Sequence, residues 1–159
     1  MVRGTLEVLL VGAKGLENTD FLNNMDPYAV IICRTQEQKS SVSTGKGSEP
    51  DWNETFVFST SEDATELIIK LMDSDVDSDD FVGEACISLE PVYMEGHIPP
   101  TVYNVVKDGE YKGEIKVGLT FTPEWIGTLR HLSLGLSIGS SKIILVTILT
   151  TWQLGEISR

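Results

Sequence analysis

The chain has 159 residues, of which 41% are hydrophobic, and a formal net charge of −12. This length suits one domain with an appended tail, and the apolar content is sufficient for a core. The negative charge argues against a nucleic-acid-binding surface and against constitutive attraction to an anionic bilayer.

The charge is distributed unevenly along the chain. Residues 1–124 contain 9 Lys/Arg and 23 Asp/Glu, a net charge of −14. Residues 125–159 contain 3 Lys/Arg and 1 Asp/Glu, a net charge of +2. The composition therefore predicts a domain over residues 1–124 and a tail of uncertain structure over residues 125–159.

Short runs rich in β-branched and aromatic residues recur through the first 124 residues, separated by Gly, Pro, Asp and Asn. Such even spacing is typical of an antiparallel sandwich or barrel. Helical periodicity never lasts for three turns, although residues 91–100 allow one helical turn. In chain order, strands are predicted at residues 5–11, 28–33, 39–43, 55–59, 66–72, 82–89, 102–106 and 114–121.

The two cysteines, Cys33 and Cys86, both fall in apolar strand-like runs, where a free thiol behaves as a small buried hydrophobe. The N-terminus has no long apolar run with a cleavage site, so a secretory leader is not expected. We therefore expect a cytoplasmic protein with reduced thiols. A disulfide between the two cysteines is the alternative.

Two groups of aspartates lie where one predicted strand ends and the next begins. The first group is Asp20 and Asp26, and the second is Asp73, Asp75 and Asp80. Carboxylates repel each other unless a positive charge lies between them, and Ca²⁺ prefers oxygen ligands. The pattern predicts a Ca²⁺ site if the two connections meet in space.

The order of these motifs over about residues 2–122 resembles the C2 domain family. The resemblance rests on the opening strand with the following Gly-Ala-Lys-Gly, on Asp20 followed by Asp26-Pro27-Tyr28, on residues 50–56, and on residues 73–84. It implies an all-β, eight-stranded antiparallel C2 β-sandwich in the permuted topology, with the extra strand at the C-terminus. The chain also looks like small single-C2 plant proteins described as elicitor-responsive.

The resemblance implies that the first and third loops converge at one end of the sandwich. Ca²⁺ binds roughly 6–8 oxygens, and a carboxylate is able to bridge two ions. Five carboxylates around one ion would leave a net charge of −3, so two ions are expected, with affinity near about 10⁻⁵ to 10⁻³ M without lipid. The implied ligands are the carboxylates of the five aspartates and the backbone carbonyls of Met25 and Ser74.

The third loop departs from the family pattern in length. It has seven positions from Asp73 to Asp80, where the family commonly has eight. Either Asp79 replaces Asp80 as a ligand, or the second ion is lost. The number of bound ions is therefore left open by the sequence.

Apolar residues lie on the same loops as the aspartates. Phe21, Leu22, Met25 and Val76 are the predicted membrane contacts, because apolar loop tips are costly in water and favourable in a bilayer interface. Bound Ca²⁺ would neutralise the loops and admit anionic phospholipids. The expected function is Ca²⁺-dependent recruitment from the cytoplasm to the plasma membrane, in signalling or defence.

Two other classes of site fit the sequence less well. The third loop has acids at EF-hand positions, but Ser78 replaces the glycine of the sharp turn and the flanks predict strands. Gly135-Leu-Ser137-Ile-Gly139 matches a nucleophile-elbow pattern, which needs a large α/β sheet. We therefore do not expect an enzyme.

Two binding functions remain as alternatives. Related small plant C2 proteins include phloem RNA-binding ones, and Arg34, Lys39 and Lys46 form a modest basic strip, although the net charge makes nucleic acid an unfavourable partner. The other alternative is a Ca²⁺-independent C2 module that binds protein. We expect a monomer in either case.

The tail contains a long apolar stretch, residues 132–154, with Lys142 as its only formal charge. Its length would allow a membrane span, but a central lysine costs roughly 2.5–3.5 kcal/mol there. An irregular appendage, a segment packed on the domain and a tail anchor therefore remain three alternatives.

Overall fold

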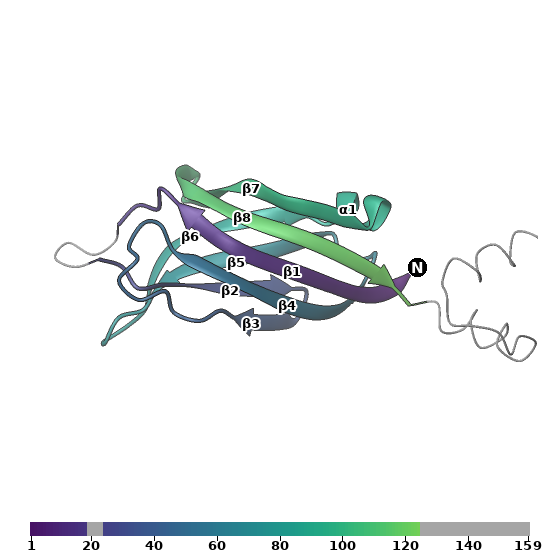
Figure 1. Cartoon of the computed structure of the whole chain (residues 1–159), viewed down its shortest axis with the longest axis horizontal. Helices are drawn as coiled ribbons and strands as arrows, with labels where there is room; N and C mark the ends of the chain where they lie inside the picture. The colour runs from purple at the N-terminus through teal and green to yellow at the C-terminus, as the bar shows by residue number, and fades with distance from the viewer. Residues whose placement is uncertain (19–23, 125–159) are drawn as a thin grey trace, which may run out of the picture. The chain divides into compact units, whose positions relative to one another are not determined.

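The computed structural model describes residues 1–18 and 24–124 of the chain, and they form one antiparallel β structure (Figure 1). The tail, and with it the alternatives for residues 132–154, lies outside the described residues. The elements are β1 (Arg3–Lys14), β2 (Pro27–Cys33), β3 (Gln36–Lys39), β4 (Asp51–Ser61), β5 (Glu66–Asp73), β6 (Asp80–Ser88), α1 (Glu90–Glu95), β7 (His97–Lys107) and β8 (Glu110–Pro123).

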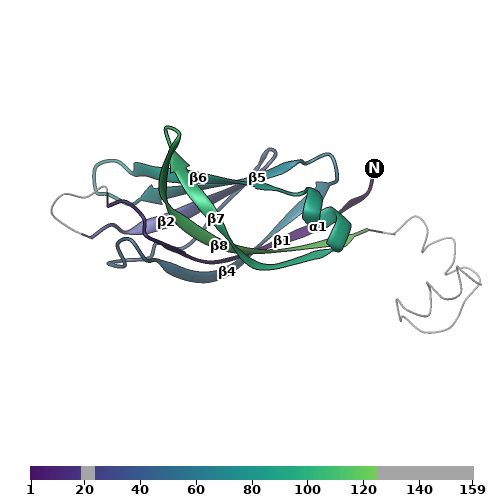
Figure 2. The ribbon, with the colours of Figure 1, turned by 90° about the horizontal axis from the view of Figure 1, so that it is seen from above.

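The strands are hydrogen-bonded in the order β3-β2-β5-β6-β7-β8-β1-β4. Strands β6 and β7 share only the pair Glu84↔Val106, so the order divides into two four-stranded layers that face each other (Figure 2). Strand β8 pairs with β1 and supplies the C-terminal strand of the permuted arrangement. The predicted eight-stranded antiparallel sandwich is confirmed.

Alternation of apolar and polar residues explains which side chains form the core. In β1, Leu6, Val8 and Leu10 are fully buried, while the residues between them face outward. Because successive side chains of a strand point to opposite faces, a strand that alternates in this way contributes one apolar row. Strand β6 follows the same rule with Ala85 and Ile87 inward and Cys86 outward.

The expectation that both cysteines are buried is therefore wrong for Cys86. Both are free thiols, but only Cys33 is buried, and its Sγ donates to Thr60 Oγ1 at 3.8 Å. Burial raises the pKa of the Cys33 thiol. Cys86 lies on the outer face because it stands between the inward-facing Ala85 and Ile87 in the alternation of β6. The average hydrophobicity of the run does not show which residues face outward.

The predicted strand at residues 39–43 is displaced, because the structure has β3 at Gln36–Lys39 instead. Arg34 adopts a φ of 55°, and the pair Cys33↔Gln36 closes a two-residue hairpin around it. After Lys39 the chain leaves the ladder, where Ser40 Oγ accepts from Ala29 N at 2.8 Å. A short polar edge strand has no apolar row, so the alternation of apolar residues along the sequence did not locate β3 correctly.

The single helical turn expected in residues 91–100 is α1, which ends at Gly96 in the left-handed conformation (φ 77°). Strand β7 begins directly afterwards, five residues before the predicted start. Pro99 and Pro100 lie in the interruption of its register with β8 between Ile98 and Thr101. Prolines are tolerated at such irregular positions because they have no N–H to donate.

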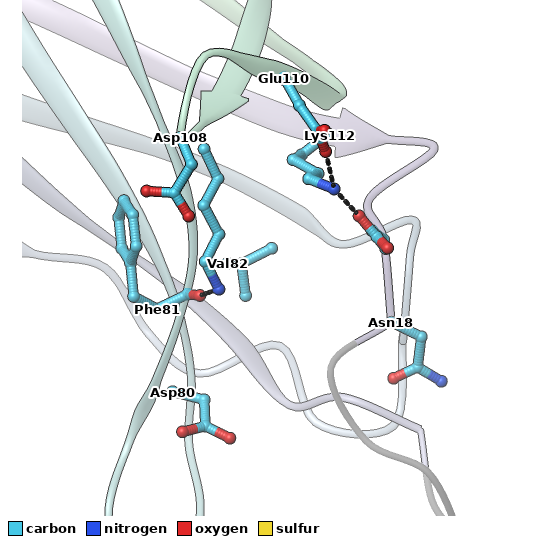
Figure 3. A pocket seen from close by; sticks show the side chains of 9 residues that line it. Asn18, Asp80, Phe81, Val82, Asp108, Glu110 and Lys112 are labelled. Atoms are coloured by element: carbon cyan, nitrogen blue, oxygen red, sulfur yellow. Dashed lines mark hydrogen bonds and ion pairs between the residues drawn. The ribbon is translucent and has the colours of Figure 1, made fainter.

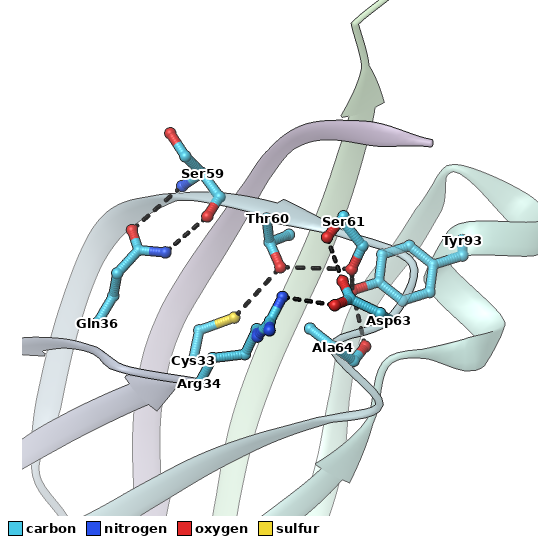
Figure 4. Close-up of polar contacts among 9 residues, drawn as sticks. All are labelled: Cys33, Arg34, Gln36, Ser59, Thr60, Ser61, Asp63, Ala64 and Tyr93. Carbon is cyan, nitrogen blue, oxygen red and sulfur yellow. Dashed lines mark hydrogen bonds and ion pairs between the residues drawn. The ribbon is translucent and has the colours of Figure 1, made fainter. Parts of the chain in front are cut away.

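The two edge strands, β3 and β4, are joined by side chains (Figure 4). Gln36 Nε2 donates to Ser59 O at 2.6 Å, and Ser59 N donates back to Gln36 Oε1 at 3.3 Å. Gln38 Nε2 donates to Val57 O at 2.7 Å. The glutamine amides thus replace the missing backbone ladder and cover two open edges that would otherwise invite aggregation.

Removing both glutamine amides, in Gln36→Ala/Gln38→Ala, should lower the free energy of unfolding by about 2 kcal/mol, since three hydrogen bonds to edge backbone are lost. Urea denaturation without Ca²⁺ measures this. Glu37→Ala, between the two glutamines on the same strand, is the control and should change stability by less than about 0.5 kcal/mol. Equal stability of the two variants would contradict the role of the amides.

Candidate functional site

The connections β3–β4 and β5–β6 and the described start of β2 lie at one end of the sandwich, opposite α1 and the N-terminus (Figures 1 and 2). We call residues 24–26, 40–50 and 73–80 the rim. The ladders of β2, β5 and β6 bring parts of the rim together: Pro27, which follows Asp26, pairs with Asp73, and Asp73 pairs with Asp80. The sheet register therefore brings Asp26, Asp73 and Asp80 to the same end.

Asp26 is the residue through which the rim is connected. Its backbone N donates to Asp73 Oδ1 at 2.8 Å, and its carbonyl accepts from Ser74 N at 3.1 Å. Its own carboxylate accepts from Gly45 N at 2.6 Å. The predicted meeting of the first and third loops is thus found for Asp26 and Asp73, and the second connection is joined to Asp26.

Asp73 is fully buried. A buried carboxylate needs hydrogen bonds or a cation to offset the loss of hydration. The Asp26 amide provides one such hydrogen bond. Asp73 therefore has a role in the fold, because it fixes the end of β5 against the start of β2.

The other rim carboxylates lie nearer to solvent. Asp79 and Asp80 are exposed, and Asp75 is half-buried. Asp75 N donates to Asp79 Oδ1 at 3.2 Å, and Tyr28 Oη donates to Asp79 Oδ2 at 2.6 Å. The hydrogen bond to Asp79 is the main cause that raises the pKa of Tyr28 to about 12.

The chemistry of these donors fits a hard cation, although the described residues alone do not complete a site. Among residues 1–18 and 24–124, no three His, Cys, Asp or Glu side chains are gathered closely enough to hold a metal ion. Asp20, a predicted ligand, lies outside the described residues. None of the ion pairs within the described ranges involves Asp26, Asp79 or Asp80.

The predicted membrane contacts divide into three outcomes. Val76 is fully exposed at 104% of its reference area on the β5–β6 connection, as a membrane contact requires. Met25 is fully buried in the core, so the prediction that its side chain contacts a membrane is wrong. Phe21 and Leu22 lie outside the described residues.

The backbone of Met25 is joined to the second connection. Its carbonyl, a predicted ligand, accepts a hydrogen bond from Gly47 N at 3.0 Å. A carbonyl oxygen has a second lone pair, so the ligand role of the Met25 carbonyl also stays a prediction. The ligand role of the Ser74 carbonyl stays a prediction.

A cleft of about 470 Å³ adjoins the rim and was not indicated by the sequence (Figure 3). Asp80 and Phe81 form one wall, and the β7–β8 hairpin forms the other. Lys107 Nζ donates to Phe81 O at 2.8 Å and lies 5.7 Å from the centre of the Phe81 ring. This lysine ties the hairpin to the start of β6.

Lys112 fastens the hairpin strand to the residues before the first loop (Figure 3). Its Nζ lies 2.5 Å from Glu17 Oε2 and 3.1 Å from Glu110 Oε2. The hydrogen bond with Glu17 is the first cause that raises the pKa of Lys112, and the same bond lowers the pKa of Glu17. Both acids are exposed, so the stabilisation is modest and salt-dependent.

The fold and the motifs at its rim define a C2 domain. A sequence model of the C2 domain matches residues 4–105, and the chain belongs to the C2 domain family. That family is generally non-catalytic. The EF-hand alternative is contradicted, because the flanks of the third loop are the strands β5 and β6.

Two plant relatives are similar over most of their length. The chain is 78% identical over 125 residues to "Elicitor-responsive protein 3" of Oryza sativa subsp. japonica, covering 78% of this chain and 87% of that protein. It is 65% identical over 124 residues to "16 kDa phloem protein 2" of Arabidopsis thaliana, covering 77% and 84%.

Two solved structures share the fold. A C2 domain-containing protein from a putative elicitor-responsive gene has a TM-score of 0.69 and 64% identity, covering 78% of this chain and 92% of that one. The calcium-bound tandem C2 domains of Extended-Synaptotagmin 2 have a TM-score of 0.66 and 29% identity, covering 76% and 46%.

Asp73→Ala should lower the free energy of unfolding in Ca²⁺-free buffer by about 1–3 kcal/mol, because the Asp26 N–H loses its acceptor. Asp73→Asn keeps an acceptor oxygen and should lose less. Asp77→Ala removes the same charge from an exposed position of the same connection and serves as the control. If Asp73→Ala and Asp77→Ala unfold at the same urea concentration, Asp73 does not hold the rim.

Proposed function

We propose that this protein binds anionic phospholipid membranes in a Ca²⁺-dependent manner. The observation that carries the proposal is the contact between Asp26 and Asp73, residues 47 apart in sequence, at a rim that also carries Asp75 and Asp80. Carboxylates that lie close together repel each other, and a bound cation would offset that repulsion. The calcium-bound state of a structural relative with 29% identity supports the choice of ion.

The residues that would hold the ion are Asp26, Asp73, Asp75 and Asp80, together with Asp20. When bound, Ca²⁺ supplies positive charge to the rim and open coordination positions for phosphate oxygens. Asp26 and Asp73 fix the first and third loops relative to each other through their hydrogen bond. The ligands are therefore partly preorganised, which lowers the entropic cost of binding.

The rim controls membrane attachment through its charge. The chain carries −12 overall, and anionic headgroups are repelled from a cluster of carboxylates. Neutralising these carboxylates removes the repulsion without a large movement of the backbone. The protein would then be cytoplasmic at low Ca²⁺ and peripheral at the plasma membrane when Ca²⁺ rises.

Apolar side chains at the rim would add binding energy once the charge is neutralised. Val76 is exposed on the β5–β6 connection, and Phe21 and Leu22 are the predicted tips of the first loop. An apolar side chain that leaves water gains roughly 25 cal/mol per Å². The similarity to Elicitor-responsive protein 3 supports a role in plant defence for this small Ca²⁺-binding module.

The RNA-binding alternative gains little from the structure. Arg34 Nη1 lies 2.7 Å from Asp63 Oδ2, and Lys39 Nζ lies 5.9 Å from the centre of the Tyr28 ring. Two of the three cations in the basic strip therefore already have partners. A gel shift with single-stranded RNA that is independent of Ca²⁺ and falls with salt would revive this alternative.

The protein should sediment with phosphatidylserine vesicles in Ca²⁺ and remain in the supernatant in chelator. Asp26→Asn should lose Ca²⁺ affinity by about 10-fold or more in calorimetry, because one charged ligand is replaced by a neutral one. Asp77→Asn is the charge-matched control. Equal sedimentation with and without Ca²⁺ would refute the proposal, and no heat of Ca²⁺ binding would favour a Ca²⁺-independent protein-binding module.

Val76→Gln should weaken vesicle binding at saturating Ca²⁺ by about 3–10-fold, since loss of a membrane-inserted valine costs roughly 1 kcal/mol. Its Ca²⁺ affinity without lipid should not change. Val57→Gln replaces a valine that is 51% exposed on β4 and is the control. If both variants bind vesicles equally well, Val76 does not enter the bilayer.

A further inference from the structure

Tyr28 lies directly after Asp26 and Pro27, where the first loop joins β2. Its side chain is only 8% exposed, and its hydroxyl donates to Asp79 Oδ2 at 2.6 Å. Asp79 stands on a different connection, 51 residues further along the chain. This bond therefore joins the first loop to the third by a second route, separate from the contact of Asp26 with Asp73.

Asp79 uses both of its carboxylate oxygens inside the protein. Oδ2 accepts from Tyr28, and Oδ1 accepts from Asp75 N at 3.2 Å. Lys39, at the end of β3 where the second connection begins, lies over the Tyr28 ring at 5.9 Å. Tyr28, on β2, thus contacts the end of β3 through Lys39 and the third loop through Asp79.

Asp80 is placed differently from its neighbour. It pairs with Asp73 in the β5–β6 ladder and lines the cleft shown in Figure 3. It takes part in no ion pair within the described part of the chain. An ion at Asp80 would leave the hydrogen bonds of Asp79 intact, whereas an ion at Asp79 would compete with Tyr28 for the same oxygen.

We propose that Tyr28 is a positioning residue for the metal site, that it fixes the third loop through Asp79, and that Asp80 rather than Asp79 is the ligand. The proposal rests on the proposed Ca²⁺ function. It also decides between the two alternatives that the short third loop left open: Asp79 serves as an internal brace, and Asp75 and Asp80 are the ligands that follow Asp73 in this loop.

The physical reason for such a brace is repulsion within the loop. Asp75, Asp77, Asp79 and Asp80 stand within six residues, and their charges favour an expanded loop. A hydrogen bond from a neutral phenol to a carboxylate is short and strong because its acceptor is charged. It holds the loop in a defined conformation before the ion arrives, so less order must be gained on binding.

The first arm of the experiment uses the metal-free full-length protein. Tyr28→Phe removes only the hydroxyl, and amide hydrogen exchange should become faster at Asp75 and its neighbours in the third loop. Tyr93→Phe is the control, because the Tyr93 hydroxyl donates to Ser61 O and Ala64 O beside α1, at the opposite end of the sandwich (Figure 4). It should leave the exchange of the third loop unchanged.

The second arm measures Ca²⁺ affinity by calorimetry. Tyr28→Phe and Asp79→Asn should each weaken it by about fivefold, and the double variant should be no weaker than either single one, because both remove the same brace. Asp80→Asn should weaken it by about 30-fold or more, as expected for a lost ligand. Asp77→Asn measures the effect of charge alone.

The possible results are separable. An affinity loss in Asp79→Asn as large as in Asp80→Asn, adding to that of Tyr28→Phe, would make Asp79 the ligand and overturn the proposal. Unchanged loop exchange in Tyr28→Phe would also overturn it, as would lower stability with normal Ca²⁺ affinity, which indicates a purely structural tyrosine. A wild-type protein that takes up no Ca²⁺ would refute the proposed function instead, while the exchange arm would still test the brace.

Discussion

The repulsion between carboxylates at one end of the sandwich is the constraint on which the rest of the structure depends. Sheet register places Asp26, Asp73 and Asp80 on adjacent strand ends, where their charges oppose folding in the absence of a cation. The protein offsets this repulsion with donors from its own backbone. Asp26 N and Gly45 N each donate to an aspartate of the rim, so the same groups that hold the loops together also orient the candidate ligands.

This arrangement links stability to function. A rim that is held by a few hydrogen bonds against electrostatic repulsion is less stable than the core, and binding loops are usually drawn from such regions. A cation that binds only the folded state would raise the free energy of unfolding. The increase grows with the logarithm of the ratio of the cation concentration to its dissociation constant. The strands beneath share a continuous core, to which Met25 of the rim also belongs, so the stability of the rim and that of the sandwich are linked.

The sandwich itself is closed by two unequal seams. On one side β6 and β7 share a single residue pair, and on the other Gln36 and Gln38 bind the backbone of β4. Side-chain amides have both a donor and an acceptor, so they satisfy an edge strand without extending the ladder. The edges are thereby covered, which protects the protein from edge-to-edge association.

The sequence predicted most of the architecture because alternating apolar residues are a local property. It indicated eight strands, and the resemblance to the C2 family implied the permuted order that the structure has. The sequence was misleading where the local pattern was weak. Strand β3 has no apolar row, and Cys86 points outward from an apolar run. Met25 lies in the core although it adjoins a predicted ligand, Asp26.

The sequence by itself determined the apolar alternation, the turn residues and the spacing of the aspartates, each of which depends only on neighbours along the chain. Only the tertiary structure decided that Asp26 contacts Asp73, that the Tyr28 hydroxyl reaches Asp79, and that glutamine amides close the open edge. These contacts join residues from 19 to 51 positions apart. Their geometry follows from strand register and loop conformation, and no local pattern specifies either.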